Sequence, residues 1–390
     1  MIVAASTPSD PWSNPGSIAT RKELVDEARR FVHGWQEDHL LEPAFQLTVT
    51  RMARFLQDLS RWIERAEASI APEMRVDLDL YESIKAPVIE RLVGFFHELD
   101  QSAAQIAPER VSTHRAFAQR ELHPLLLCAP FVHRSYTKPL GYPGDYGIVE
   151  IMLDEPRRGP NIYAQILNAA SLATKPAVAH CNRIEMLVER LQTEAQRAAG
   201  QGRRLRLLDV GCGPAAEIER FIMRSELSDL CTFQLMDFNA PTLAHARGKL
   251  EAARATHHRR AELEWNHRSI HDLLRDAVKG SVGREPEYDV IFCAGLYDYL
   301  TDRVCRRLTQ LFYSLTKPGG LIVTTNVHPS NPVRCYMEFV LEWYLEYRDE
   351  AKMLAFAENL GEAQTARDQT GVNVFLDIRR PGPPPMNETT

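Results

Sequence analysis

The chain has 390 residues, of which 44% are hydrophobic, so it is long enough to form two domains that each bury a core. Its formal net charge is −6, and acidic and basic residues are interspersed along it. Such a chain lacks the strong positive field that binding to nucleic acids or anionic membranes requires. We therefore expect a small-molecule partner, no nucleic acid and no membrane, and the sequence gives no indication of the oligomeric state.

Cysteine usage and the N-terminus bear on the cellular compartment. The seven cysteines are scattered and form no C-x-x-C pair, which argues against a disulfide framework and against a zinc site. Residues 1–20 are rich in serine and proline and lack the basic and apolar order of a signal peptide. No apolar run is long enough to span a bilayer. These features predict a cytoplasmic protein without a metal site.

The first half of the chain has the pattern of helices. Between residues 21 and 200 apolar residues recur every three or four positions, as at Phe45, Val49 and Met52. The run Tyr136-Thr-Lys-Pro-Leu-Gly-Tyr-Pro-Gly-Asp145 interrupts this pattern, because its two prolines and two glycines do not fit inside a regular helix. We predict an all-helical domain that contains one structured loop.

The second half has the pattern of an α/β fold. From Arg203 onward, short β-rich runs alternate with amphipathic segments, which is typical of βαβ units and a parallel sheet. The first five strands are expected at 204–210, 231–237, 262–267, 288–294 and 320–327. A helix is expected over 333–348, followed by a hairpin with strands at 363–368 and 372–379 around Gly371. The sheet would then have seven strands, the last of them antiparallel.

These patterns divide the chain into four segments. We expect a disordered N-terminus at 1–20, a helical domain at 21–200, an α/β domain at 201–380 and a disordered tail at 381–390. The tail consists of proline, glycine and polar residues, which have little apolar surface to bury. The fold class is therefore α/β, with a Rossmann-like sheet preceded by an all-helical domain.

The most specific local feature is the run Leu207-Leu-Asp-Val-Gly-Cys-Gly-Pro214, an apolar strand that leads through a glycine-rich turn into a helix. Gly211 and Gly213 allow the backbone to approach a ligand closely, because neither has a Cβ atom. Asp209 places a carboxylate where a pyrophosphate would be repelled, and Ala216 replaces the third glycine of a dinucleotide fingerprint. S-adenosylmethionine (SAM) carries an ammonium and a sulfonium and no phosphate, so this turn suits SAM better than NAD.

Further candidate ligands of SAM follow the next strands. Asp237 ends the second strand, where Rossmann-like proteins bind ribose hydroxyls, although it could instead cap the next helix together with Asn239. Ser269 and Ile270 follow the third strand, where an adenine would lie, but a short polar turn is equally ordinary there. The predicted SAM-binding residues are Asp209, Gly211, Gly213, Pro214, Asp237, Phe238, Ser269, Ile270 and Ala294.

These residues resemble the class I SAM-dependent methyltransferase superfamily, whose first motif is an acidic residue followed by G-x-G and whose second is an acid that ends the second strand. The stretch Tyr288-Asp-Val-Ile-Phe-Cys-Ala-Gly-Leu-Tyr-Asp-Tyr-Leu300 is similar to the fourth motif of that superfamily. The stretch Leu315-Thr-Lys-Pro-Gly-Gly-Leu-Ile-Val-Thr324 resembles its last parallel strand and the turn before it. The resemblance covers the C-terminal half and implies SAM as methyl donor or as substrate.

The reacting groups are expected beyond the carboxyl ends of the strands, where ligands of open α/β sheets lie. A hydroxyl acceptor would need a base such as His328 or Asp298, whereas a carboxylate acceptor is already ionised near neutral pH. The loop 136–146 has the composition of an active-site lid, and the alternative is a structural turn between domains. The candidate catalytic residues are Tyr142, Asp145, Tyr297 and His328.

Two further motifs narrow the resemblance to a bacterial subgroup: K-P-x-G-Y-x-G-D before the SAM fold and W-Y-L-x-Y-R after the fifth strand. The subgroup includes enzymes similar to 3-hydroxy fatty acid methyl ester (extracellular factor) synthases and azetidine-2-carboxylate synthases. The leading hypothesis is a methyltransferase for a small or lipid-like carboxylate or hydroxyl, in secondary metabolism or signalling. The alternatives are cyclisation of SAM itself with release of methylthioadenosine, and a non-catalytic SAM-binding protein.

Overall fold

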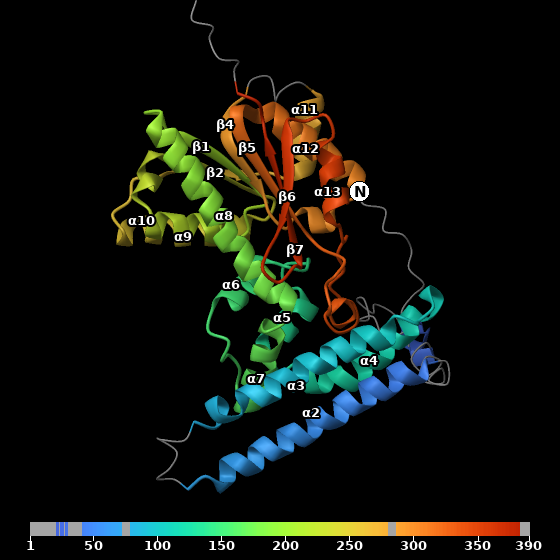
Figure 1. The fold of residues 1–390 in the computed structure, drawn as a ribbon. Coiled ribbons are helices and arrows are strands. Elements are labelled where there is room, and N and C mark those ends of the chain that lie inside the picture. Colours follow the sequence, from blue (N-terminus) through green and yellow to red (C-terminus); the bar gives the residue numbers. More distant parts are fainter. Residues whose placement is uncertain are drawn as a thin grey trace, which may run out of the picture. The chain divides into compact units, whose positions relative to one another are not determined.

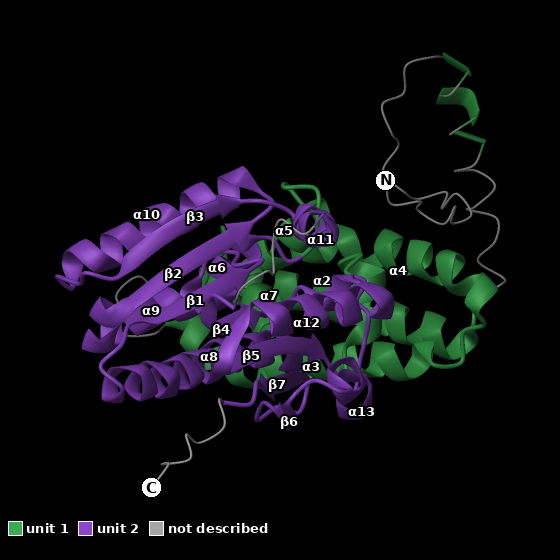
Figure 2. Cartoon of the chain, turned by 90° about the horizontal axis from the view of Figure 1, so that it is seen from above, with its two compact units in different colours: residues 1–143, 154–174, 332–343 green, residues 144–153, 175–331, 344–390 purple. Residues whose placement is uncertain are grey.

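The computed structural model describes residues 41–71, 79–279 and 286–382, together with isolated positions between 21 and 29. The expectations for 1–20 and for most of 381–390 lie outside these residues. The chain forms two compact units, coloured green and purple in Figure 2. The first comprises residues 1–143, 154–174 and 332–343, and the second comprises residues 144–153, 175–331 and 344–390.

The regular elements described in the first unit are all helical (Figure 1). They are α2 (Pro43–Ser69), α3 (Leu80–Ala103), η3 (Pro108–Arg110), α4 (Val111–Leu126), α5 (Pro130–Thr137), α7 (Ile162–Leu172) and the π-helical turn η6 (Tyr336–Val340). The apolar spacing seen in the sequence forms the buried stripe of α2, where Phe45, Val49 and Met52 have no exposed surface. Tyr336 of η6 stacks on Phe96 of α3 with ring centroids 4.0 Å apart, so this late segment completes the core of the first unit.

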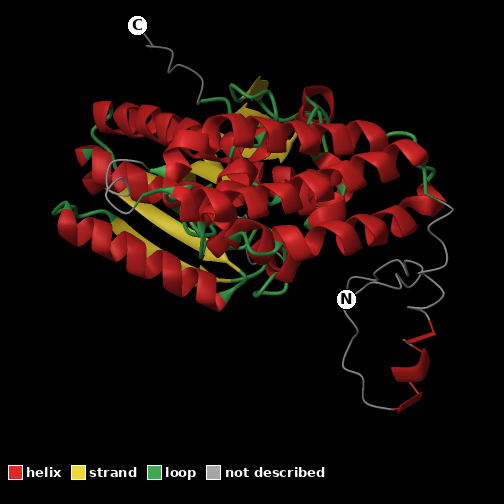
Figure 3. Ribbon diagram, turned by 90° about the horizontal axis from the view of Figure 1, so that it is seen from below, coloured by secondary structure: helices red, strands yellow, loops and turns green. Residues whose placement is uncertain are grey.

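The second unit is built on a seven-stranded sheet, drawn in yellow in Figure 3. Its strands are β1 (Leu205–Val210), β2 (Cys231–Asp237), β3 (Glu262–His267), β4 (Tyr288–Cys293), β5 (Thr316–Val327), β6 (Glu362–Arg367) and β7 (Asn373–Arg379). The order across the sheet is β3-β2-β1-β4-β5-β7-β6, and β7 runs antiparallel to both of its neighbours. This sheet confirms the predicted fold class, including the antiparallel last strand.

Helices cover both faces of the sheet. One face packs against α8 (Lys175–Gly200), α9 (Ala216–Arg224) and α10 (Ala240–Thr256). The other packs against α11 (Ile270–Val278), α12 (Asp302–Leu315), α13 (Glu350–Leu354) and the short turns η5 (Tyr297–Tyr299) and η7 (Ala355–Ala357). The unit also contains α6 (Tyr146–Leu153) and η4 (Glu226–Leu230). Among the described residues, no helix has the length and apolarity needed to cross a membrane.

The prediction of a helix over 333–348 is wrong, because the helical element in this stretch is only the short π-helical turn η6. Glu342 has a left-handed backbone with φ of 49°, which an α-helix does not allow. The backbone beyond it bonds to the strand ends instead: Glu346 N donates to Asp298 O at 2.7 Å, and Arg348 N donates to Val327 O at 3.1 Å. Arg348 is completely buried and is held by Asp302 and by backbone carbonyls, so its role is structural.

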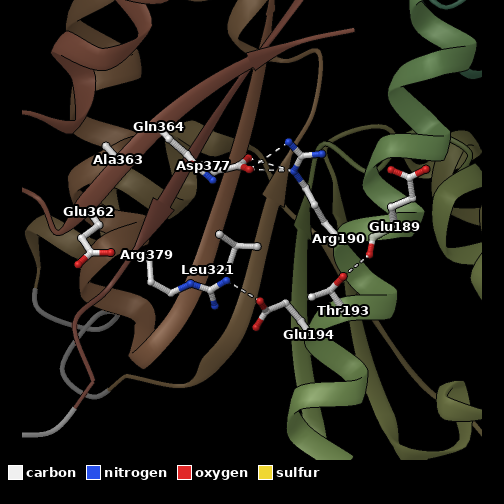
Figure 4. Close-up of a pocket in the computed structure, with 10 residues that line it drawn as sticks. All are labelled: Glu189, Arg190, Thr193, Glu194, Leu321, Glu362, Ala363, Gln364, Asp377 and Arg379. Carbon is white, nitrogen blue, oxygen red and sulfur yellow. Dashed lines mark hydrogen bonds and ion pairs between the residues drawn. The ribbon is translucent and has the colours of Figure 1, made fainter. Parts of the chain in front are cut away.

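The long helix α8 precedes the boundary expected at 200–202, yet it belongs to the second unit. One side of it, including Leu187 and Leu191, is buried in the core of the sheet. On another side, a groove of about 630 Å³ separates α8 from β5, β6 and β7, as Figure 4 shows. Two ion pairs cross this groove, Arg190 to Asp377 at 3.0 Å and Glu194 to Arg379 at 2.6 Å.

Candidate cofactor site

The glycine-rich turn connects β1 to α9. Gly211 and Gly213 have positive φ angles of 71° and 54°, a conformation that glycine adopts without steric cost. The amides of Gly211 and Cys212 both donate to the carbonyl of Met236, at 2.8 and 3.1 Å, which ties the turn to β2. Pro214 is buried just before α9 begins. The turn is thus fixed at the carboxyl ends of β1 and β2, where the sequence predicts a ligand.

Asp237 is the last residue of β2, and its side chain is buried beside this turn. One carboxylate oxygen accepts from the amide of Asn239 at 2.9 Å, and the other accepts from the amide of Gly213 at 3.2 Å. Asn239 itself is the N-cap of α10, because its side chain accepts from the amide of Thr242. The carboxylate of Asp237 is therefore oriented both by the glycine turn and by the backbone at the start of α10, and its role as a ribose ligand stays a prediction.

Two further buried carboxyl groups flank the glycine turn in the sequence. Asp209 at the end of β1 and Glu217 in the first turn of α9 influence each other electrostatically, and their exposed fractions are 2% and 8%. Burial, together with Glu217, raises the pKa of Asp209 well above its ordinary value, and burial also raises the pKa of Glu217. Sequence reasoning missed Glu217, because an acid in the first turn of a helix is expected there for the helix dipole alone.

Arg183 of α8 brings a cation to the same place. A Cβ atom added to Gly295, which follows β4, would lie 2.7 Å from Arg183 Nη1, so the guanidinium packs directly on this backbone. Its Nη2 lies 2.8 Å from Nδ1 of His180, and its charge acts on Asp209, Glu217 and Asp298. Sequence reasoning missed this role of Arg183, because an arginine on an amphipathic helix normally faces solvent.

The residues expected around an adenine have mixed surroundings. Ser269 is the N-cap of α11 and forms a capping box with Asp272, so its hydroxyl is occupied as the polar-turn alternative predicts. Ile270 and Ala294 are partly buried. Phe238 leaves 54% of its surface exposed directly after Asp237, although large aromatic side chains are usually buried. It is the exposed apolar ring at the carboxyl end of β2.

The end of the expected lid is attached to the second unit through α6. Asp145 accepts from the amides of Gly147 and Ile148 at 2.9 and 3.1 Å, so it caps α6. Tyr146 stacks on His245 of α10 with ring centroids 4.3 Å apart. Tyr142 belongs to the first unit. The structural evidence for Asp145 is therefore a helix cap, and a catalytic role for Asp145 and Tyr142 stays a prediction.

Tyr297 does not face the site. It is completely buried between the sheet and α12, its hydroxyl lies 2.8 Å from Oγ1 of Thr309, and it donates to the carbonyl of Cys305 at 3.3 Å. Burial raises its pKa well above 10, so it stays a neutral phenol. Tyr297 is therefore a core residue, because the short helical turn η5 directs its ring between the sheet and α12, and the structure does not support a catalytic role for it.

His328 follows β5 as expected, but both ring nitrogens have partners. Nδ1 accepts from the amide of Ser330 at 3.0 Å, which leaves the proton on Nε2, 3.5 Å from a carboxylate oxygen of Glu350. In this arrangement His328 offers no lone pair to an acceptor proton. Asp298 is the better candidate base: it is buried near Arg183, its Oδ1 accepts from the amide of Val327 at 2.7 Å, and burial raises its pKa to about 6.

No protein-family model matches the chain, and no curated protein matches it. Among solved structures, it is similar to a possible exported protein from Bordetella parapertussis, over 80% of this chain and 100% of that one, at 13% identity and a TM-score of 0.48. It is also similar to the magnesium protoporphyrin IX methyltransferase from Synechocystis PCC 6803 with bound SAH, over 64% and 98% of the chains, at 11% identity and a TM-score of 0.42. The N-methyltransferase NodS from Bradyrhizobium japonicum WM9 covers 51% and 98% of the chains, at 16% identity and a TM-score of 0.34. Likenesses of this size establish no activity, so the proposal below rests on the residues of the site.

Proposed function

We propose that the second unit binds SAM at the turn after β1 and that the protein is a SAM-dependent methyltransferase acting on a small or lipid-like acceptor. The observation that carries this proposal is the surplus of buried acids around a glycine turn. Asp209, Glu217 and Asp237 are at most 8% exposed; the charge of Arg183 acts on Asp209 and Glu217, and that of Arg220 acts on Glu217. Such a site repels a pyrophosphate and favours a ligand with net positive charge.

Three parts of SAM, the ribose, the adenine and the carboxylate, have a candidate binding group in the second unit. Asp237 is a carboxylate at the strand end where a ribose diol is bound in Rossmann-like folds. The exposed ring of Phe238 offers a flat apolar surface for the adenine. Arg183 offers a guanidinium for the carboxylate of the methionine part, and such charge-assisted bonds are about twice as strong as neutral ones.

Methyl transfer is an in-line displacement at the sulfonium methyl, so alignment of donor and acceptor is the main contribution of the protein, worth roughly 7–11 kcal/mol in favourable cases. A carboxylate acceptor arrives ionised and needs no base. A hydroxyl acceptor would lose its proton to Asp298, whose raised pKa brings it closer to neutral pH. We propose such an acceptor in secondary metabolism or signalling, in a cytoplasmic setting.

The deciding experiment separates the three hypotheses. The purified full chain is incubated with SAM alone, then with a panel of hydroxy acids and fatty acids, and the products are identified by mass spectrometry. We expect intact SAM without acceptor and S-adenosylhomocysteine plus a methylated acceptor with one member of the panel. Methylthioadenosine and a cyclic amino acid from SAM alone would instead make SAM the substrate. Tight SAM binding with no product in either assay would indicate a non-catalytic SAM-binding protein.

A further inference from the structure

The groove between α8 and the β6 end of the sheet has no part in the proposed reaction. Its volume of about 630 Å³ is within the range of small-molecule sites, and residues of α8, β5, β6 and β7 line it (Figure 4). In the strand order β3-β2-β1-β4-β5-β7-β6, the glycine turn is tied to β1 and β2, on the other side of β4 from this groove. A ligand in the groove would leave the candidate cofactor site free.

The two arginines that line the groove are both paired. Nε of Arg190 donates to the two carboxylate oxygens of Asp377, at 3.1 and 3.0 Å. Arg379 lies 2.6 Å from a carboxylate oxygen of Glu194, which also pairs with Arg197 at 2.6 Å. The groove therefore offers no uncompensated positive charge to an anionic ligand.

Two further acids of the lining have no such partner. Glu189 of α8 and Glu362 of β6 come from opposite walls of the groove, and both side chains are exposed. Among the described residues, neither carboxylate has a hydrogen bond or an ion pair, and Figure 4 draws no interaction to either carboxylate. Four carboxylates face two guanidinium groups, so the lining carries a net charge of about −2. Burial also raises the pKa of Asp377 although Arg190 is bonded to it, so this carboxylate too is favoured by a further cation nearby.

The spacing of these acids determines which kind of cation fits. Within the described part of the chain, no three His, Cys, Asp or Glu side chains are grouped closely enough to hold a metal ion. A matching ligand must instead carry positive charges at separate positions, one for each wall. Leu321 lines the groove as well and contributes apolar surface, which suits a hydrocarbon chain between the charges.

We propose that this groove is a binding site for an aliphatic polyamine, separate from the candidate cofactor site. One ammonium group pairs with Glu189, a second pairs with Glu362, and the methylene chain between them lies along Leu321. Aliphatic amines resemble the lysine side chain, whose pKa is about 10.4, so they are charged at neutral pH. A bound polyamine would connect α8 to β6, in addition to the two ion pairs that connect α8 to β7.

The test is calorimetric titration of the full chain with spermidine at pH 7.5 and constant ionic strength, without SAM. We expect saturable binding of about one spermidine per chain. 1-Aminobutane can pair with only one wall, so it should bind several-fold more weakly, because an exposed ion pair contributes up to about fivefold in affinity. Magnesium chloride at the same ionic strength should not displace spermidine.

A pair of double variants separates the groove from the net charge of the chain. Glu189→Gln/Glu362→Gln removes both unpaired acids and should lower the affinity for spermidine by about 5- to 25-fold. Glu67→Gln/Glu251→Gln is the matched control, because Glu67 of α2 and Glu251 of α10 are also exposed but do not line the groove. It changes the net charge by the same amount and should bind spermidine as the wild type does.

Each outcome decides the proposal. Absence of saturable spermidine binding to the wild type overturns it, and so does an unchanged affinity in Glu189→Gln/Glu362→Gln. An equal loss in both double variants would show non-specific attraction to an acidic protein and overturns it as well. If the groove variant does not fold, the single variants Glu189→Gln and Glu362→Gln, each expected to lose up to about fivefold, decide instead. SAM takes no part in these titrations, so their failure leaves the proposed function untouched.

Discussion

At the scale of the residue, the position of Arg183 depends on Gly295. Gly295 has a φ of 85°, and a Cβ atom there would lie 2.7 Å from Arg183 Nη1 and 3.1 Å from Nη2. Any side chain at this position would therefore be strained and would displace the guanidinium. Gly295 is therefore needed to leave room for the guanidinium of Arg183, which belongs to α8.

The role assigned to Arg183 can be tested with a ligand that lacks the carboxylate. Wild-type protein should bind decarboxylated SAM about 10- to 100-fold more weakly than SAM, because charged hydrogen bonds contribute about 1.5–3 kcal/mol. Arg183→Met should weaken SAM binding by a similar factor and bind both ligands about equally. Calorimetric affinities of the four combinations form a double-mutant cycle. If the variant still prefers SAM as strongly as the wild type does, Arg183 does not bind the carboxylate.

At the scale of the element, α8 positions Arg183. Its apolar side packs into the core, but its side toward β7 faces the groove of Figure 4 and is joined to β7 by ion pairs. The side chains of Arg190 and Asp377 are only 16% and 13% exposed, so each charge is largely removed from water and is compensated by the other. Arg183 and Arg190 are seven residues apart, two helical turns, and so lie on the same side of α8.

Removing one partner of this pair should loosen α8. Arg190→Met leaves the carboxylate of Asp377 buried without its cation, so we expect a loss of stability of up to about 3 kcal/mol and weaker SAM binding. The double variant Arg190→Met/Asp377→Asn should recover most of the stability, since it leaves no unpaired charge. Glu189→Gln is the control, because Glu189 lines the same groove but its side chain is exposed. Thermal melts measure the change in stability, and calorimetry measures the change in SAM affinity. An unchanged melting temperature in Arg190→Met would contradict a stabilising role of the ion pair between Arg190 and Asp377.

At the scale of the whole molecule, the buried acids make stability depend on pH. A carboxyl group whose pKa is raised in the folded state favours folding when protonated, and this contribution is lost as pH rises through the folded pKa. For the Asp209–Glu217 pair this pKa is well above the ordinary value. Histidines with lowered pKa, such as His114 and His123, act in the opposite direction but only below about pH 6.5. Above about pH 6.5, a loss of stability with rising pH therefore reports mainly on groups with raised pKa.

Ligand-free protein should accordingly melt at a progressively lower temperature as the pH is raised above about 6.5. The buried thiols contribute in the same direction, because burial raises their pKa as well. Glu217→Gln isolates the pair: its melting temperature should depend less on pH than that of the wild type. Equal pH dependence in the two proteins would show that the pair carries no proton in this range.

Features that depend on local sequence patterns were predicted, and features that depend on long-range topology were not. Strand periodicity and the glycine turn are local, so all seven strands and the positions of Asp209 and Asp237 were expected. The chain after Glu342 was not, because its backbone bonds to residues far away in sequence. Arg183 was missed for the same reason, because only the folded topology brings α8 to the end of β4. Glu217 was missed because an acid in the first turn of α9 is expected for the helix dipole alone.

The interleaving of the two units has a consequence for how this protein can be divided. Residues 332–343 belong to the first unit, yet they are inserted between β5 and β6 of the second. Within the first unit, Tyr336 stacks on Phe96 and lies 3.0 Å from Ser171 Oγ. A cut at residue 200 would leave the helical part without this stacking partner, and the α/β part without α8. We therefore expect that neither unit could be transferred alone to another protein by gene fusion or recombination, so the two units should be inherited together.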